Sequence, residues 1–169
     1  MPIFLIPVAI IVGIFIFTVL FGAPYVPSRN AELQKAFKNL YPLSKKDLLI
    51  DLGSGDGKVL KVASEFGARS VGVELNPILV FISKLRLRKN KNTTVVCRDY
   101  FHYDFPAETS VVYVFSEDRD MPKMVRHIEK QAKQIGHPIY LISHAFEVTG
   151  YKAEKTYRAY YLYKIKEAK

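Results

Sequence analysis

The stretch LLIDLGSGDGKVL, Leu48 to Leu60, is the strongest indication of the fold of this chain. An apolar run ends in the carboxylate of Asp51, and the seven residues from Asp51 to Gly57 hold three glycines and two aspartates. From Lys58 the apolar residues recur with helical spacing. A strand, a glycine-rich turn and a helix in this order are typical of nucleotide-binding α/β folds.

The rest of the chain alternates short apolar runs with helical patterns. Further strands are predicted at Ser70–Glu74, Thr94–Arg98, Ser110–Phe115, Pro138–Ser143 and Arg158–Ile165, and helices at Asn30–Leu40, Lys58–Phe66, Pro77–Lys89 and Met121–Gln134. Asn76 is placed to cap the helix that starts at Pro77. The pattern predicts an α/β fold with a mostly parallel, twisted sheet covered on both faces. No helical pattern separates the last two strands, which predicts an antiparallel hairpin at the edge.

The N-terminal segment predicts a membrane anchor. Ile3 to Gly22 is twenty residues long and carries no charge; as a helix it would span about 30 Å, the thickness of a bilayer's hydrocarbon core. A cleaved signal peptide fits less well, because no basic region precedes the run and no A-x-A-like site follows it. A buried core helix fits less well too, because the remainder is small for covering such a helix on all sides. We therefore expect an anchor at residues 1–23 and one domain at residues 24–169.

The residues after the apolar segment predict the orientation of this single-pass anchor. The first charged residue is Arg29, and Lys35, Lys38, Lys45 and Lys46 follow. The positive-inside rule then places the domain on the cytoplasmic side, or on the side equivalent to it such as a matrix. Cys97 is the only cysteine, which agrees with a reducing compartment. Because the histidines show no metal-ligand spacing and one cysteine cannot build a zinc site, we expect no metal site.

The glycine turn itself restricts the ligand. The spacing Gly53-x-Gly55-x-Gly57 brings the third glycine one residue too early for the dinucleotide fingerprint, and Val59 stands where a P-loop needs Ser or Thr. Asp51 and Asp56 would repel a pyrophosphate, by about 4 kcal/mol for each pair of unit charges 4 Å apart at an effective dielectric near 20. The ligand is therefore not expected to be polyanionic.

S-adenosylmethionine (SAM) suits this turn, because its ammonium and sulfonium groups are attracted to carboxylates and backbone N–H groups can hold its one carboxylate. Acids also end the next two strands: Glu74 stands 21 residues after Gly53, where an acid accepts from ribose hydroxyls. Asp99 is placed for the adenine amino group, with Tyr100 and Phe101 beside the ring. The predicted cofactor-binding residues are Asp51, Gly53, Ser54, Gly55, Asp56, Gly57, Glu74, Leu75, Asp99, Tyr100 and Phe115.

Several of these motifs together resemble those of a known family. DLGSGDGKVL and VGVELNP resemble motifs I and II of class I SAM-dependent methyltransferases, whose fold is Rossmann-like. PYVPS, at Pro24–Ser28, and LISHAFEVTGY resemble the archaeal protein-lysine methyltransferases and the membrane-anchored mitochondrial enzymes that modify the ATP synthase c-subunit and the adenine nucleotide translocase. The resemblance covers about Pro24 to Lys166, and the acidic segment FSEDRDMPK departs from the family pattern.

The resemblance implies a SAM-dependent lysine N-methyltransferase acting on a membrane or membrane-associated protein. A lysine acceptor must lose its proton, which costs roughly 4.6 kcal/mol at pH 7 for a pKa near 10.4. An aromatic pocket and a nearby carboxylate would reduce this cost, so the candidate catalytic residues are Tyr113, Glu117 and Tyr25. Two alternatives stay open: methylation of a lipid-soluble small molecule, and a silent SAM-binding module held at the membrane.

The run SKLRLRKNKN, Ser83 to Asn92, has five cationic residues in ten. It predicts the exposed face and C-terminal end of a helix, where cations suit the helix dipole. Anionic lipid headgroups are the next interpretation, and nucleic acid is the least favoured.

Overall fold

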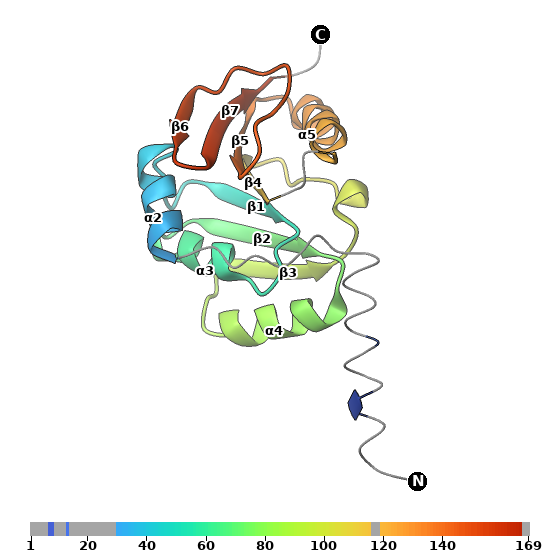
Figure 1. The fold of residues 1–169 in the computed structure, drawn as a ribbon. Helices are drawn as coiled ribbons and strands as arrows, with labels where there is room; N and C mark the ends of the chain where they lie inside the picture. The colour runs from blue at the N-terminus through green and yellow to red at the C-terminus, as the bar shows by residue number, and fades with distance from the viewer. Residues whose placement is uncertain (1–6, 9–12, 14–29, 116–118, 167–169) are drawn as a thin grey trace.

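The computed structural model of the chain describes residues 7–8, 13, 30–115 and 119–166, and it contains a single mixed sheet (Figure 1). The strands are β1 (Leu48–Leu52), β2 (Arg69–Glu74), β3 (Thr93–Cys97), β4 (Thr109–Phe115), β5 (Ile139–His144), β6 (Lys155–Tyr157) and β7 (Tyr160–Ile165). The helices are α2 (Asn30–Asn39), α3 (Lys58–Glu65), α4 (Pro77–Leu87) and α5 (Met121–Ile135), with a 3-10 turn η1 at Tyr100–His102.

The strand order is β3-β2-β1-β4-β5-β7-β6. β1 to β5 pair in parallel, and β7 runs antiparallel to both β5 and β6. The order reverses between β1 and β4, and in open α/β sheets a ligand binds at such a point, outside the carboxyl ends of the strands. The topology confirms the predicted Rossmann-like fold with a mostly parallel sheet.

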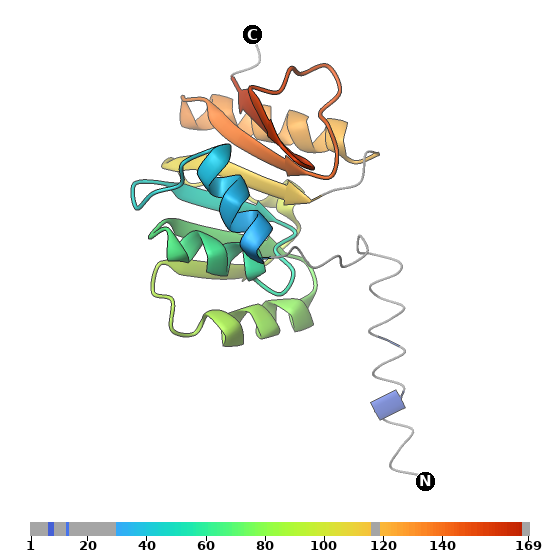
Figure 2. The ribbon, with the colours of Figure 1, turned by 60° about the vertical axis from the view of Figure 1, so that its left-hand side comes forward.

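The two faces of the sheet are covered by different helices. Figure 2 shows α2 and α3 on the near face and α5 on the far face. The first core cluster packs α2, α3 and α4 against one face, around Phe37 and Leu60. The second packs α5 and the segment around η1 against the other, around Met124 and Ile128. Asn76 caps α4 as expected, accepting from the N–H groups of Ile78 and Leu79.

The C-terminal edge differs from the prediction in one strand. β7 pairs with β5 as expected, but β6 lies outside it and forms the edge. Arg158, predicted inside a strand, stands in the turn between β6 and β7 with φ of 53°, a left-handed conformation outside the range of regular strands. β6 has only three residues, too few to show an alternating pattern.

Most of the predicted anchor lies outside the described residues. Of Ile3–Gly22 the structure describes Pro7, Val8 and Gly13, all with helical backbone. No helix among the described residues combines the length and the apolar character that crossing a bilayer requires.

Candidate active site

Five side chains form a row along the carboxyl ends of the strands, on the face covered by α2 and α3. Leu49, Val111, Tyr113 and Ile142 belong to the core cluster of that face. Side chains two residues apart on a strand share a face, which gives Asp51, Phe115 and His144 the same direction. Strand register pairs Asp51 with Tyr113 and Phe115 with His144, and it pairs Asp51 with Gly72, two residues before Glu74 on β2. The row is Glu74, Asp51, Tyr113, Phe115 and His144.

The glycine turn after β1 is built from left-handed residues. Gly53, Gly55 and Gly57 have φ of 80°, 53° and 79°, which glycine adopts without strain. A Cβ at Gly57 would lie 2.2 Å from Ser83 Oγ, so this glycine lets α3 approach α4. A Cβ at Gly53 would meet nothing within 4 Å. The open side of Gly53 is therefore where a ligand can approach the backbone.

The N–H groups of this turn are largely used within the protein. Those of Gly53 and Ser54 both donate to the carbonyl of Val73, at 2.9 and 3.2 Å, and that of Gly57 donates to the carbonyl of Ser54 at 2.9 Å. The N–H of Gly55 donates to Glu74 Oε2 at 2.9 Å. Three of these amides hold the turn against β2, and that of Gly57 closes the turn on itself. This leaves fewer N–H groups for a ligand carboxylate than the sequence suggested.

Asp51 is a buried acid with unused acceptor capacity. Its residue is 2% exposed, and within the described part of the chain no donor reaches its Oδ2 atom. Burial raises the pKa of Asp51 well above its usual value, and the negative charges of Glu74 and Asp56 raise it further. A buried carboxyl group in this condition favours a cationic ligand, whose charge would restore the ionised form.

Glu74, at the end of β2, organises the loop around it. Oε2 accepts from Gly55 N–H and Oε1 accepts from Asn76 N–H at 2.8 Å. A carboxylate has about four acceptor positions, so two backbone bonds leave room for hydroxyl groups of a ligand. Glu74 thereby connects the glycine turn to the N-terminus of α4.

Asp56 has a different environment from the other two acids. Its Oδ2 atom lies 2.6 Å from Arg86 on α4 and 4.0 Å from Lys58. The ion pair with Arg86 fixes the start of α3 against α4. Ser54 is also buried, and no hydrogen-bond partner reaches its Oγ atom among the described residues.

The predicted adenine site lies at the end of β3. Asp99 Oδ1 accepts from Phe101 N–H at 2.9 Å, and Oδ2 lies 3.0 Å from His102 Nδ1, so Asp99 caps η1. The Tyr100 and Phe101 rings contact each other edge to face, with centroids 4.6 Å apart. Leu75, after β2, is 46% exposed. These residues form an accessible rim beside Glu74.

An aromatic cluster continues the row on the other side of Asp51. The hydroxyl of Tyr113 lies 3.1 Å from His144 Nδ1. The His144 ring stacks on Tyr160 with centroids 4.2 Å apart and lies 5.0 Å from the Phe115 ring. Burial lowers the pKa of His144, and the Glu32 carboxylate opposes this shift. The imidazole is therefore neutral at pH 7, when the unperturbed value is about 6.5.

His144 and Tyr160 were missed as site residues from the sequence. The sequence did offer a signal for His144, because it directly follows a predicted strand of a mostly parallel sheet and ligands bind outside the carboxyl ends of such strands. Tyr160 carried no such signal, because its place beside His144 depends on the antiparallel pairing of β5 with β7. Tyr25 and Glu117, both predicted as catalytic, lie outside the described residues, so their roles stay predictions.

The residues of the row fit SAM better than an anionic nucleotide. Asp51 offers a buried, unsatisfied acceptor for a cationic group, Glu74 offers further acceptor positions for hydroxyls, and Gly53 leaves space beside its backbone. Beyond Asp51 the wall becomes aromatic and weakly polar, which favours a neutral amine over an ammonium. The chemistry of this row suits a cationic nucleoside next to a neutral nucleophile.

Comparisons with known proteins agree with this geometry. A family model described as "ANTKMT methyltransferase domain" matches residues 51–155. The chain is 29% identical over 119 residues to the lysine N-methyltransferase of the ATP synthase c-subunit from Xenopus laevis, covering 69% of this chain and 51% of that protein. It is 27% identical over 159 residues to a protein-lysine N-methyltransferase of Saccharolobus islandicus, covering 86% of this chain and 96% of that protein.

Among solved structures, the fold is similar to that of an RNA methyltransferase from Salinibacter ruber in complex with S-adenosyl-L-homocysteine. The TM-score is 0.75 at 24% identity, over 85% of this chain and 95% of the other. At this identity the likeness concerns the fold. The chain spans about half the length of the Xenopus laevis relative.

Proposed function

Because this chain belongs to the ANTKMT methyltransferase domain family, a family of class I SAM-dependent methyltransferases, we propose that it methylates the side-chain amine of a lysine in a protein. The names of two relatives, a lysine N-methyltransferase of the ATP synthase c-subunit and a protein-lysine N-methyltransferase, support this choice of acceptor. The observation that carries it is the row of side chains in which buried Asp51 adjoins the Tyr113–His144 pair.

SAM, the cofactor of this family, supplies a methyl group on a cationic sulfur. Asp51 and Glu74 would hold the cofactor through its positive charge and its hydroxyls, and the glycine turn would let the backbone come close to it. Tyr113 and Phe115 exclude water from the edge between β1 and β4, next to Asp51. Positioning and desolvation of this kind account for much of the rate of a displacement reaction.

His144 is the candidate proton acceptor. In the tautomer that carries its proton on Nδ1, the N–H donates to the Tyr113 hydroxyl oxygen, and Nε2 keeps its lone pair. A neutral imidazole with a lowered pKa can then take a proton from the lysine ammonium before transfer. Glu117 and Tyr25 are proposed to complete the acceptor site.

We further propose that the enzyme is tethered to a membrane and acts on a membrane or membrane-associated protein. The support is the uncharged run Ile3–Gly22 followed by Arg29 and the lysines after it. By the positive-inside rule this order supports a domain on the cytoplasmic or matrix-equivalent side. Only six residues, Ala23 to Ser28, separate that run from Arg29, and extended they reach at most about 20 Å. A lysine in a short loop of a small integral membrane protein would lie within reach of the sheet edge.

The test uses full-length protein in detergent, incubated with methyl-labelled SAM and a membrane extract. We expect label on lysine of a small integral membrane protein, identified by mass spectrometry. Label confined to lipid or RNA, or to no acceptor at all, would overturn the proposal in favour of a small-molecule enzyme or a silent SAM-binding module. Glu74→Ala is the matched control, because losing charge-assisted hydrogen bonds of about 1.5–3 kcal/mol each should weaken SAM binding at least tenfold.

A further inference from the structure

Helix α4 exposes an apolar stripe on its outer side. Ile78, Phe81, Ile82 and Leu85 recur at the spacing of one helix face and are 41%, 68%, 39% and 54% exposed. The opposite face of the same helix, with Val80, Ser83 and Leu87, is buried against the sheet. A surface helix normally directs polar residues outward, and a contiguous exposed apolar patch marks an interaction surface.

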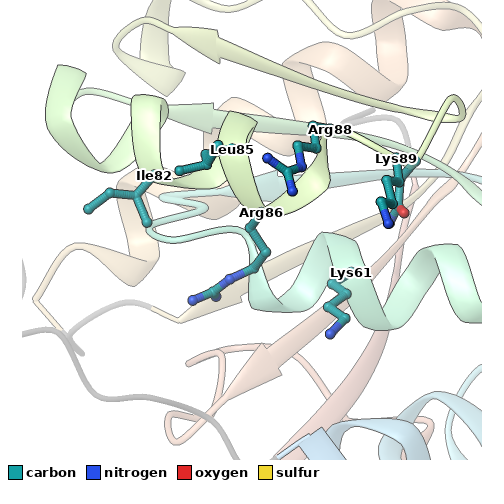
Figure 3. A pocket seen from close by; sticks show the side chains of 7 residues that line it. Lys61, Ile82, Leu85, Arg86, Arg88 and Lys89 are labelled. Atoms are coloured by element: carbon teal, nitrogen blue, oxygen red, sulfur yellow. The ribbon is translucent and has the colours of Figure 1, made fainter.

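Cationic side chains flank this stripe. At 100° per residue, Lys84 and Arg88 lie along one side of the stripe, and Lys89 follows its end. Figure 3 shows Arg88 and Lys89 around a depression that Ile82 and Leu85 also line. No acidic residue occurs between Pro77 and Asn92, and among the described residues no ion pair involves Lys84, Arg88 or Lys89. We call the stripe together with Lys84, Arg88 and Lys89 the α4 face.

We propose that the α4 face docks on the surface of an anionic lipid bilayer. A helix with an apolar stripe bordered by Lys and Arg lies in the interface plane, with the stripe among the acyl chains and the cations at the headgroups. The chemistry of the face meets both halves of that environment. This contact is separate from the predicted anchor and needs no particular methyl acceptor.

Charge complementarity favours lipid over the other occupants. The chain's own apolar segment could cover the stripe, but Met1 to Ser28 carries no charge and would leave the cations of the α4 face without anions. Nucleic acid would meet the cations and leave Phe81 and Leu85 against a charged backbone. An anionic bilayer satisfies the apolar and the cationic residues together.

Docking would also orient the active site. α4 starts at Pro77, three residues after Glu74, and Asn76 connects the two through its hydrogen bond with Glu74. With the helix lying on the bilayer, the N-terminal end of α4 keeps the cofactor edge close to the membrane surface. Figure 1 shows α4 beyond β3, at the end of the sheet opposite to β6. The β6 edge would then face away from the lipid.

Tryptophan fluorescence tests this contact, because the chain contains no tryptophan. Full-length F81W is reconstituted into vesicles of phosphatidylcholine, alone or mixed with phosphatidylglycerol, with brominated phosphatidylcholine as the quencher. Y157W, with its reporter on β6, is the matched control. We expect at least twofold stronger quenching for F81W than for Y157W in the anionic vesicles, with a blue-shifted emission.

The charge requirement is tested in the same assay. Adding K84Q, R88Q and K89Q to F81W should reduce the quenching to the level of Y157W, and so should removing phosphatidylglycerol. The proposal would be overturned by equal quenching for F81W and Y157W, or by quenching that does not depend on these cations. A blue shift that added RNA produces and vesicles do not would also overturn it. Calorimetry with SAM on the same samples distinguishes failure of the proposed function from failure of the docking proposal. Lost SAM binding with intact quenching would contradict the proposed function and not the docking.

Discussion

Two buried aspartates show how the environment of a single residue separates stability from function. Asp47 accepts hydrogen bonds from Tyr41, Ser44 and Ser110. Burial alone would raise its pKa, but these hydrogen bonds outweigh burial and lower it. Asp51 lacks a partner at Oδ2 within the described chain, and its pKa is raised. The first acid stabilises the fold, and the second is kept at the expense of stability.

Asp51→Asn should stabilise the ligand-free protein and weaken SAM binding. A raised pKa means that the ionised form costs stability as the pH rises above the unfolded value near 3.9, up to and through the folded pKa. Removing that charge should add at least about 1 kcal/mol to the free energy of unfolding at pH 7 and lower SAM affinity at least tenfold. Urea unfolding against pH and calorimetry measure the two effects.

Asp47→Asn is the matched control, with the opposite sign. A lowered pKa gives stability that is present above about pH 3.9 and lost as the pH falls through the folded pKa. This variant should therefore lose stability at pH 7 and keep its SAM affinity. If both variants shift stability in the same direction, the assignment of Asp51 as an unsatisfied acid is wrong.

His144→Gln should lower the rate of methyl transfer by at least about a hundredfold, the low end of the effect of a lost general base, with SAM affinity unchanged. Because burial lowers the pKa of His144, its stability contribution is present above about pH 6.5 and lost as the pH falls through the lowered folded pKa. As the pH falls from about 6.5 through that folded pKa, the free energy of unfolding of the variant should therefore decrease less than that of the wild type. His137→Gln, at the amino end of β5, is the control. A variant with full activity at pH 7 would exclude the role as proton acceptor.

Among the elements, the turn between β1 and α3 allows a comparison of Gly53 with Gly57, which have nearly the same φ but different surroundings. Gly53 faces open space and Gly57 faces Ser83, although φ is 80° at one and 79° at the other. The left-handed conformation costs an L-residue roughly 1–2 kcal/mol. Position within the turn therefore decides whether a substitution affects the ligand or the fold.

Gly57→Ala should lower the free energy of unfolding by about 2–5 kcal/mol, from the left-handed backbone and overpacking against Ser83 together. Gly53→Ala should lose only about 1–2 kcal/mol of stability but bind SAM at least tenfold more weakly, because its methyl group enters the open space. Denaturant unfolding and calorimetry measure both variants.

Gly136→Ala controls for the backbone term alone. Gly136 ends α5 with φ of 78° and open space around its Cβ position. It should lose stability as Gly53→Ala does and keep wild-type SAM affinity. Unchanged affinity in Gly53→Ala would mean that the ligand does not approach this part of the turn.

For the whole molecule, the described core connects helices and strands from one continuous part of the chain. Both core clusters consist of residues between Leu33 and Ile165, and helices from that range cover both faces of the sheet. The strands that carry Asp51, Glu74, Tyr113 and His144 pair directly with one another. This domain therefore has the contacts that independent folding requires.

Deleting Met1 to Gly22 should leave a folded domain that still binds SAM. We expect circular dichroism to show the same helix and strand content, a single cooperative unfolding transition, and SAM affinity within about threefold of the full-length protein. Loss of the transition, or aggregation of the truncated chain, would mean that the segment packs into the core and does not act as an anchor.

Sequence signals alone predicted the order of the elements and the position of the glycine turn. The glycine spacing, the Asn76 cap and the alternation of strands with helices are signals between residues close in the chain. Such signals depend on local backbone preferences and hydrophobic periodicity, which act before any tertiary contact forms. They predicted the edges of most elements to within one or two residues, and they placed Asp51 and Glu74 at strand ends.

Which of these residues contact one another depends on the packing of the strands and helices. The hydrogen bond between Tyr113 and His144 joins residues 31 positions apart, and it follows from the register of β4 and β5. Asp56 forms an ion pair with Arg86 because the start of α3 lies against α4. β6 forms by pairing with the free edge of β7. The outer face of α4 is the same kind of outcome, because the helix has apolar residues on both sides. Local sequence does not indicate which side of α4 the sheet will cover, since that depends on the positions of β2 and β3, which precede and follow the helix in the chain.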